Sequence, residues 1–440
     1  MAKTFRDWNV EQRWLLPPSV MDFVPADHVA HFVRDTVREQ LDLSEIIAPY
    51  EKEERGYPPY HPVMMTALLL YGYCQGVYSS RRIAKACEER VDFMAVTGMN
   101  RPDFRTVSDF RKRHLDALQG LFVQVLKLCQ GAGLVKLGHV SLDGTKVKAN
   151  ASKHKALSYG RMQERQRQLR AEVRELLAQA EAADAAEDAH YGADRRGDEL
   201  PAELQRRETR LKKIRAAQRA LEERARQSAE KAGKSRAEVQ SAKPADKDQY
   251  NFTDPQSRLM KGSDGLVQGY NAQAAVEPVL QLIVGQSVTP AANDKQQIEP
   301  MVQVIEQQSG QRPTRLLADS GYCSEKNLAY LAALSQSGYP IDCYIATGKQ
   351  KHDEYRQPCS RGPLLRNATR VERMKRKLQT KVGRAVYATR KTIVEPVFGQ
   401  IKQARGFRQF LMRGLAKVQG EWALVCLTHN ILKLHRLCSA

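Results

Sequence analysis

The sequence predicts an α/β protein in which helices flank a mixed sheet, with an all-helical region before the sheet and a helical hairpin inserted into it. Apolar residues recur at helical spacing through most of residues 1–135. Residues 156–240 are a charged block rich in Ala, Glu, Arg and Gln. From residue 262 onward, short apolar runs alternate with amphipathic segments, as in strands connected by helices. We therefore expect a helical domain over 1–135 and a second domain over 136–440, interrupted by the hairpin at 156–240.

The helical region contains a pattern compatible with a helix-turn-helix DNA-binding motif. The apolar run HPVMMTALLLYGYCQG predicts a buried helix. A second helix follows with Ser79 or Ser80 as its N-cap, and one long helix starts near residue 103. Basic residues near the starts of these two helices are candidates for DNA contact: Arg81, Arg82, Lys85, Arg105, Arg111, Lys112 and Arg113. A helical bundle with a solvated basic face explains this pattern equally well.

The charged block predicts two long antiparallel helices around the turn-like stretch YGADRRGD. Its apolar stripe is thin, so each helix needs the other to cover it. Because the hairpin follows the first strand of the sheet, we expect a protruding arm that serves in dimerisation or in clamping DNA. Residues 241–261 are expected to be a loop or an extended segment.

The first strand of the predicted sheet is HVSLDGTKVKAN, residues 139–150, with Asp143 in its middle. Aspartate is uncommon in strands, so its presence has three possible explanations. The segment could be an edge strand, Asp143–Gly144 could form a hairpin turn, or the carboxylate could serve catalysis. Two further strands flank the turn Glu277–Pro278 and complete an antiparallel meander.

Strands and helices then alternate, which predicts parallel strands joined by crossovers. A helix begins with Asn293 or Asp294 as N-cap, and the strand TRLLA ends at Asp319. Ser324–Glu325 starts the next helix, DCYIATGKQ is another strand, and two helical segments close the chain. One of these segments, YATRKTIVEPVFGQIK, contains Tyr387, Arg390, Glu395 and Lys402.

Charge and composition narrow the class of protein. There are 70 Lys and Arg against 50 Asp and Glu, a net charge of +20, which favours a polyanionic partner: nucleic acid first, and an anionic membrane second. A merely basic surface remains the alternative. There is no apolar run long enough for a membrane span, the N-terminus lacks the apolar core of a signal peptide, and the eight cysteines show no zinc-ligand or disulfide spacing. We expect a cytoplasmic protein.

Three acids, Asp143, Asp319 and Glu395, are the candidate catalytic residues. Neighbouring strands of a mixed sheet can bring the two aspartates together, and a helix packed on the sheet can add the glutamate. Carboxylates this close repel one another unless cations offset their charge, and oxygen ligands suit Mg²⁺ or Mn²⁺. Taken singly, each acid is explained as well by a turn, a loop or a surface ion pair.

The motifs SLDGTKVKANASKHKA, GYNAQAAVE, LLADSGYCSE and Y-x2-R-x4-E-x6-K resemble, in this order, the DDE transposases of bacterial insertion sequences. The resemblance covers nearly the whole chain. It implies a ribonuclease H-like core in which Asp143, Asp319 and Glu395 bind the metal ions. It also implies that Tyr387, Arg390 and Lys402 match a Tyr-Arg-Glu-Lys signature, and these residues together with Lys391 are candidates for DNA contact. That signature has three residues between Arg and Glu. Here four residues separate Arg390 from Glu395, and three separate Lys391 from Glu395. Lys391 and Arg390 both remain candidates for the Arg role.

The resemblance therefore implies a metal-dependent enzyme, with Mg²⁺ as cofactor, that cleaves the ends of an insertion sequence and transfers the 3′-OH ends to target DNA. Its partners would be double-stranded DNA and further copies of itself, as a homodimer or higher assembly in the bacterial nucleoid. Two alternatives stay open: an inactive transposase that serves as a DNA-binding regulator, and another nuclease of the same fold.

Overall fold

The computed structural model describes residues 19–52, 58–135, 137–191, 202–262, 265–348, 362 and 367–438. Its first part is entirely helical, as predicted. The helices are the 3-10 turn η1 (Val20–Phe23), α1 (Val29–Glu39), α2 (Ser44–Glu51), α3 (Pro62–Cys74), α4 (Ser80–Glu89), α5 (Val91–Thr97), α6 (Phe104–Arg113) and α7 (Leu115–Gly131). Helix α3 is the predicted apolar helix, and it is buried almost throughout because α1, α5 and α16 (Leu415–Cys438) pack around it.

The predicted long helix from residue 103 is wrong, since the structure divides it into α6 and α7 at His114. His114 has φ −106° and ψ 20°, outside the helical region. Its Nε2 lies 3.0 Å from the Tyr50 hydroxyl, and its ring packs against Phe110. A tertiary contact thus turns the chain at a residue that is neither Gly nor Pro, so no local signal marked the break.

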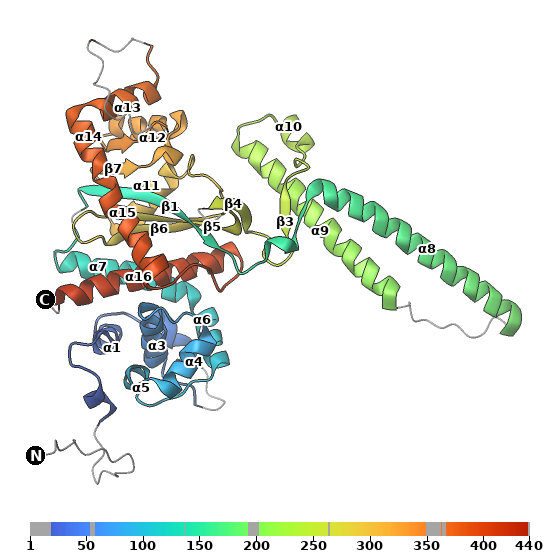
Figure 1. Ribbon diagram of the computed structural model, residues 1–440, viewed down its shortest axis with the longest axis horizontal. Coiled ribbons are helices and arrows are strands. Elements are labelled where there is room, and N and C mark those ends of the chain that lie inside the picture. Colours follow the sequence, from blue (N-terminus) through green and yellow to red (C-terminus); the bar gives the residue numbers. More distant parts are fainter. Residues whose placement is uncertain are drawn as a thin grey trace, which may run out of the picture.

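A mixed sheet forms the centre of the second part, and its topology agrees with the prediction (Figure 1). The strands are β1 (His139–Lys148), β4 (Arg258–Gly262), β5 (Gly265–Val276), β6 (Ile283–Thr289), β7 (Arg315–Ala318) and β8 (Asp342–Ile345). They run in the order β4-β5-β1-β7-β8, with β6 also paired to β5. The pairs β1–β5, β4–β5 and β5–β6 are antiparallel, whereas β1–β7 and β7–β8 are parallel.

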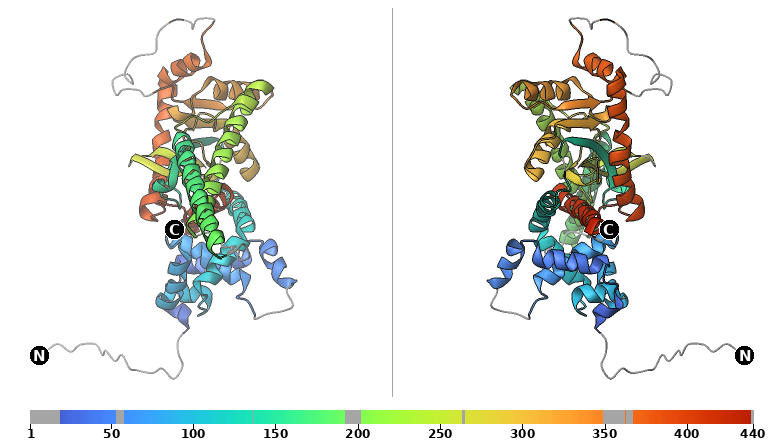
Figure 2. Two further views of the ribbon diagram at one scale, coloured as in Figure 1. Left: turned by 90° about the vertical axis from the view of Figure 1, so that its right-hand side faces the viewer. Right: turned by 90° about the vertical axis from the view of Figure 1, so that its left-hand side faces the viewer.

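Helices cover both faces of this sheet. They are α11 (Ile298–Ser309), α12 (Glu325–Gln336), α13 (Arg370–Gln379), α14 (Lys381–Ala388), α15 (Arg390–Gly399) and α16, with a π-helical turn at Gln400–Ala404. Figures 1 and 2 place α15 on one side of the sheet and α11 with α12 on the other. Helix α12 starts after Ser324 as predicted. The N-cap of α11 is Gln297 and not Asn293 or Asp294, because Asp294 is engaged inside the sheet.

The predicted hairpin is present as α8 (Tyr159–Tyr191) and α9 (Ala202–Lys231), which we call the arm. The Tyr159 hydroxyl donates to Glu222 at 2.7 Å and Arg207 pairs with Glu172 at 2.9 Å, so the two helices are antiparallel. The stretch YGADRRGD lies outside the described residues apart from Tyr191. A separate apolar cluster, which includes Met162, Leu169, Leu211 and Ile214, holds the two helices together.

The base of the arm joins the sheet through short elements in the segments before and after it. The 3-10 turn η2 (Lys153–Lys155) and β2 (Ala156–Ser158) precede the arm, and α10 (Arg236–Ser241) and β3 (Gln249–Asn251) follow it. Strands β2 and β3 form a two-stranded sheet of their own. Within the predicted loop or extended segment 241–261, the structure therefore has β3 and the start of β4.

The N-terminal helices and the C-terminal helix α16 share one apolar core with the sheet. Helix α16 packs on α3 and α7 as well as on β6. The Tyr78 hydroxyl donates to the carbonyl of Arg405 at 3.0 Å, and Tyr73 donates to the buried Glu421 at 3.4 Å. Both side views in Figure 2 show the N-terminal helices stacked directly against α16. The core is thus continuous across the boundary predicted near residue 135.

Candidate active site

Asp143 lies in the central strand of the sheet, beside Asp319. Strand β1 is paired on both edges, with β5 and with β7, and Asp143 and Gly144 oppose Ala274 and Gln273 of β5. Leu142 is aligned with Ala318 in the parallel pair, so the next residues, Asp143 and Asp319, follow at the same level. The edge-strand and hairpin-turn alternatives for Asp143 are therefore excluded, and the two predicted aspartates come together.

Both aspartates occupy a poorly hydrated environment. Burial raises the pKa of Asp143 to about 6, with Arg390 opposing this shift and Asp319 adding to it. Burial also raises the pKa of Asp319, against the hydrogen bond that its Oδ1 accepts from Gly321 N at 2.8 Å. Asp143 Oδ1 accepts a similar bond from Gly144 N at 2.8 Å. Two carboxylates in a site of this kind call for a positive partner when both are ionised.

Arg390 supplies positive charge from α15. Its Nη1 lies 3.0 Å from Asp143 Oδ2, and its Nη2 lies 3.4 Å from Glu395 Oε1. The Arg390 side chain is only 10% exposed, whereas the Glu395 side chain is 51% exposed. Lys391 is exposed. Of the two candidates for the Arg role, Arg390 is thus the one that joins the first acid to the third.

Sequence patterns did not identify Asp294 as part of this site. Its Oδ1 accepts hydrogen bonds from Asn271 Nδ2 at 2.6 Å and from Gln273 Nε2 at 2.7 Å, and its Oδ2 lies 3.7 Å from Lys146 Nζ. Asn271 and Gln273 are fully buried, as is Tyr322, whose hydroxyl donates to Gln273. The one available signal was the pair of amides at alternating positions of GYNAQAAVE, each between residues that are apolar or small.

Gly144 has no room for a side chain. A Cβ at this position would lie 2.8 Å from both Asn271 Oδ1 and Asp294 Oδ1. Asn271 Oδ1 is buried and has no hydrogen-bond partner among the described residues, while its Nδ2 is held by Asp294 and by the carbonyl of Ala291. This acceptor lies on the face of the sheet toward which a Gly144 side chain would point, opposite to the face of the Asp143 side chain.

Three residues predicted to contact DNA from the segment around Glu395 have different surroundings. Lys402 belongs to the π-helical turn, and its Nζ donates to the carbonyl of Lys146 at 2.9 Å. Tyr387 on α14 is half-buried, and Lys391 is exposed on α15. Lys146 itself is largely buried beside Asp294, and burial lowers its pKa.

The predicted cations of the N-terminal helices are exposed, with one exception. Arg81 on α4 and Arg105 on α6 both stack against Phe104, at 5.2 Å and 5.7 Å from its ring centre, so α4 and α6 present a common basic surface. Exposed cations on the same helices are Arg82, Lys85, Lys112 and Arg113. Arg111 instead points inward, where its guanidinium donates to the Tyr73 hydroxyl, the Tyr78 carbonyl and Ser80 Oγ.

The donor set of the site has the chemistry that a hard divalent cation requires. Asp143, Asp319 and Glu395 offer carboxylate oxygens. Among the described residues, no three Asp, Glu, His or Cys side chains are near enough to one another to hold a metal ion as they stand. Glu395 is hydrogen-bonded to Arg390 in this arrangement.

Two family models match the chain: a transposase domain (DUF772) over residues 18–113 and a transposase DDE domain over residues 355–435. They confirm the resemblance to insertion-sequence DDE transposases. The first match contains the basic surface of α4 and α6. The second contains Arg390 and Glu395 but begins after Asp143 and Asp319, so it includes neither aspartate. No curated protein and no solved structure matches the chain. No helix in the described residues combines the length and the apolar character that a membrane crossing requires.

Proposed function

We propose that this chain, which carries two transposase domains, is a metal-dependent enzyme that cleaves the DNA ends of an insertion sequence and transfers the 3′-OH ends to target DNA. The observation that carries the proposal is the parallel pairing of β1 with β7, which aligns Asp143 with Asp319. From helix α15, Arg390 bonds to both Asp143 and Glu395. The three acids follow one another along the chain in the order that DDE transposases use.

A ribonuclease H-like core is the fold we propose for the second part. The support is the strand order β6-β5-β1-β7-β8, in which three antiparallel strands are followed by two parallel ones. In this arrangement the central strand carries the first acid, and its parallel neighbour ends at the second.

Asp143 and Asp319 would hold the cation, with Glu395 completing the set. When bound, a divalent cation supplies Lewis-acid chemistry to a phosphodiester and lowers the pKa of water. Arg390 keeps Asp143 ionised and in place through its 3.0 Å bond, and Asp294 orients the amides of Asn271 and Gln273. Gly144 is required on the strand because a Cβ there would collide with the side chains of Asn271, Gln273 and Asp294.

We assign recognition of the element ends to the basic surface of α4 and α6. The surface consists of Arg81, Arg82, Lys85, Arg105, Lys112 and Arg113, with Phe104 between Arg81 and Arg105. Arg111 is left out because it is buried and its two terminal nitrogens donate to groups inside the protein. Each phosphate contact from such a surface steepens the loss of affinity with salt. Because transposition joins paired ends, two or more copies would act on one DNA.

The test is cleavage of a labelled duplex that carries the inverted repeats flanking the gene. Wild-type protein in Mg²⁺ should release a 3′-OH end, and Asp143→Asn should abolish this product while still binding the duplex. Asp27→Asn, which removes an equal charge from an exposed position, is the matched control and should cleave normally. Undiminished cleavage by Asp143→Asn would refute the proposal.

A further inference from the structure

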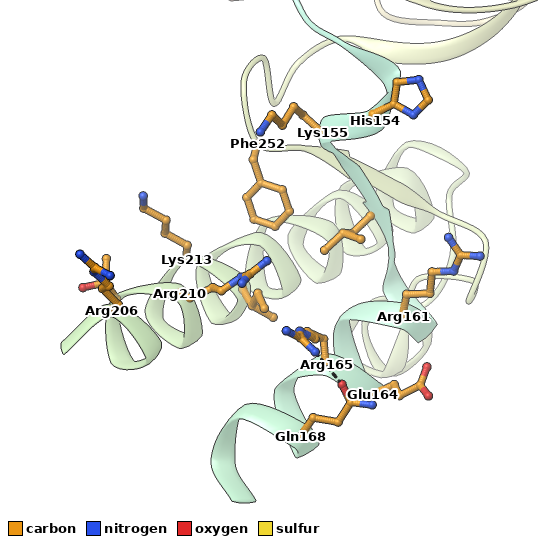
Figure 3. Close-up of a pocket in the computed structure, with 13 residues that line it drawn as sticks. His154, Lys155, Arg161, Glu164, Arg165, Gln168, Arg206, Arg210, Lys213 and Phe252 are labelled. Carbon is orange, nitrogen blue, oxygen red and sulfur yellow. Dashed lines mark hydrogen bonds between the residues drawn. The ribbon is translucent and has the colours of Figure 1, made fainter. Parts of the chain in front are cut away.

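A cavity of about 670 Å³ opens at the base of the arm, between α8, α9 and the segment that leads out of β1 (Figure 3). Its lining is dominated by cationic groups from three elements. Helix α8 contributes Arg161 and Arg165, helix α9 contributes Arg206, Arg210 and Lys213, and η2 contributes Lys155. The one carboxylate in the lining is Glu164. We call this site the arm cavity.

Most cations of the arm cavity have no ion-pair partner among the described residues. In the part of the chain that the structure describes, Arg161, Arg206, Arg210 and Lys213 form no ion pair. Their neighbour Arg207, which is not part of the lining, pairs with Glu172 at 2.9 Å. Several like charges around one hollow repel each other and create a strong positive potential there. A ligand that carries several negative charges at regular spacing would relieve this repulsion.

The floor of the cavity is apolar. Leu157, Ile214 and Phe252 line it, and the Phe252 ring is 36% exposed. An apolar and aromatic floor below a cationic rim suits a ligand with alternating anionic and flat or apolar parts. A nucleic-acid strand has this composition, since its phosphates meet cations while its sugars and bases stack on aromatic rings. A cavity of this volume accepts a stretch of one strand but not the cross-section of a duplex.

The cavity is connected to the candidate active site through the backbone. Strand β1, which carries Asp143, ends at Lys148, and the chain passes directly into η2 with Lys155. The amide of Phe252 donates to the Lys155 carbonyl at 3.1 Å, which ties the floor to this turn. The arm cavity is thus fixed to the end of the strand that holds the first catalytic acid.

We propose that the arm cavity binds the phosphodiester backbone of DNA next to the cleaved end, as a second DNA site in addition to the basic surface of α4 and α6. The inference rests on the proposed function, because it presumes that the chain acts on DNA. Phosphates bind between the cations of α8 and those of α9, and Phe252 contacts the sugar or base that lies between them.

The experiment compares two triple variants of the full chain on the same helix. Arg206→Gln/Arg210→Gln/Lys213→Gln removes three cations from the cavity. Lys212→Gln/Arg215→Gln/Arg219→Gln removes three exposed cations that do not line it. Both lose the same charge, and glutamine has a helix propensity close to that of the residues replaced. Binding of a labelled duplex element end and of a single strand of the same sequence is measured by fluorescence anisotropy over a range of salt concentrations, with a chelator present to prevent cleavage.

The cavity triple should lower the slope of log affinity against log salt by about two to three, because each lost phosphate contact removes about one unit for a duplex and somewhat less for a single strand. The control triple should change the slope by less than about one. A loss confined to the single-stranded probe identifies an unpaired strand as the ligand, and a loss with both probes identifies backbone that remains accessible in the duplex.

Equal slopes for the two triples overturn the inference, while normal end cleavage by wild type would leave the proposed function standing. If wild type shows no salt-dependent DNA binding, the inference and the proposed function both fail.

The sequence of 176–191 carries four acids and no Lys or Arg, so this segment of a second copy of the chain is the competing occupant of the cavity. A cavity triple that binds DNA normally but changes molar mass in light scattering would establish that occupant instead. Arg161→Gln on the opposite wall, with exposed Arg167→Gln as its control, repeats the test without altering α9.

Discussion

Arg390 donates a hydrogen bond of 3.0 Å to Asp143, across 247 positions of sequence. The bond joins helix α15 to the central strand, and the guanidinium is only 10% exposed. Because the same guanidinium also reaches Glu395, Arg390 sets the relative positions of two of the three candidate catalytic acids. Its removal should therefore change both the charge and the geometry of the site.

We predict that Arg390→Ala lowers the rate of end cleavage by on the order of 10²-fold and the free energy of unfolding at pH 8 by on the order of 3 kcal/mol. A buried carboxylate left without its charged partner is the reason for both effects. Lys391→Ala, at the exposed neighbouring position, should change the unfolding free energy by less than about 0.5 kcal/mol. Cleavage assays and urea unfolding measure the two quantities. Equal effects of the two substitutions would contradict the assignment of Arg390 to the signature.

Two substitutions of Asp294 distinguish the effect of its charge from the effect of its hydrogen bonds. Asp294→Asn keeps an oxygen for the amides of Asn271 and Gln273 and loses the charge that faces Lys146, whereas Asp294→Ala loses both. We expect the free energy of unfolding of the alanine variant to be roughly 2–4 kcal/mol below that of wild type, because buried amide donors without acceptors are costly. The value for the asparagine variant should lie between those of the alanine variant and wild type. Urea unfolding in the presence of a chelator tests the order. An asparagine variant as unstable as the alanine variant would show that the ion pair, and not the amide bonds, dominates.

The raised pKa of Asp143 predicts a particular dependence of stability on pH. The unfolded carboxyl titrates near 3.8 and the folded one near 6, so the folded state binds more protons between these values. Stability of the metal-free protein therefore falls as pH rises through this window, by up to about 3 kcal/mol from this residue, and is constant above it. Asp143→Asn lacks this loss, so its stability relative to wild type should increase from pH 4 to pH 6. Asp27→Asn should show no such trend, and a flat difference for Asp143→Asn would exclude the raised pKa.

Gly76 tests the continuity of the core between the N-terminal helices and the C-terminal part. It has φ +71°, and a Cβ there would lie 2.6 Å from the carbonyl oxygen of Arg405. Gly76→Ala should cost about 3 kcal/mol or more, from left-handed strain and from displacement of that backbone. Gly98 has φ +57° with nothing within 4 Å, so Gly98→Ala should cost only about 1 kcal/mol. Similar costs in urea unfolding would mean that the two parts separate readily at Gly76.

Sequence patterns were sufficient for the elements whose signals are local. Asp143 and Asp319 interrupt or end apolar runs, and the crossover rule makes their strands parallel neighbours, so their meeting could be predicted. The hairpin followed from composition. The parallel strands followed from the helices between them, since α11 precedes β7 and α12 connects β7 to β8.

Features that depend on tertiary contacts could not be predicted in this way. Asp294 has the sequence context of an N-cap, and only the folded sheet shows that Asn271 and Gln273 claim its oxygens. Arg111 precedes the exposed Lys112 and Arg113, yet it lies on the buried face of α6 together with Val107 and Phe110. The choice between Arg390 and Lys391 required knowledge of which face of α15 meets β1.

The packing of α3 against α16 has a consequence for the synthesis of the protein. Helix α3 ends at Cys74 and α16 begins at Leu415, so the N-terminal helices wait for a partner that is synthesised much later. At about 5–20 residues per second, that interval is roughly 20 to 70 seconds. During it the apolar face of α3 has no C-terminal helix to cover it, and the strands that bring Asp143 and Asp319 together are made before α15 and α16. A nascent chain of this protein therefore completes its shared apolar core only after α16 has been synthesised.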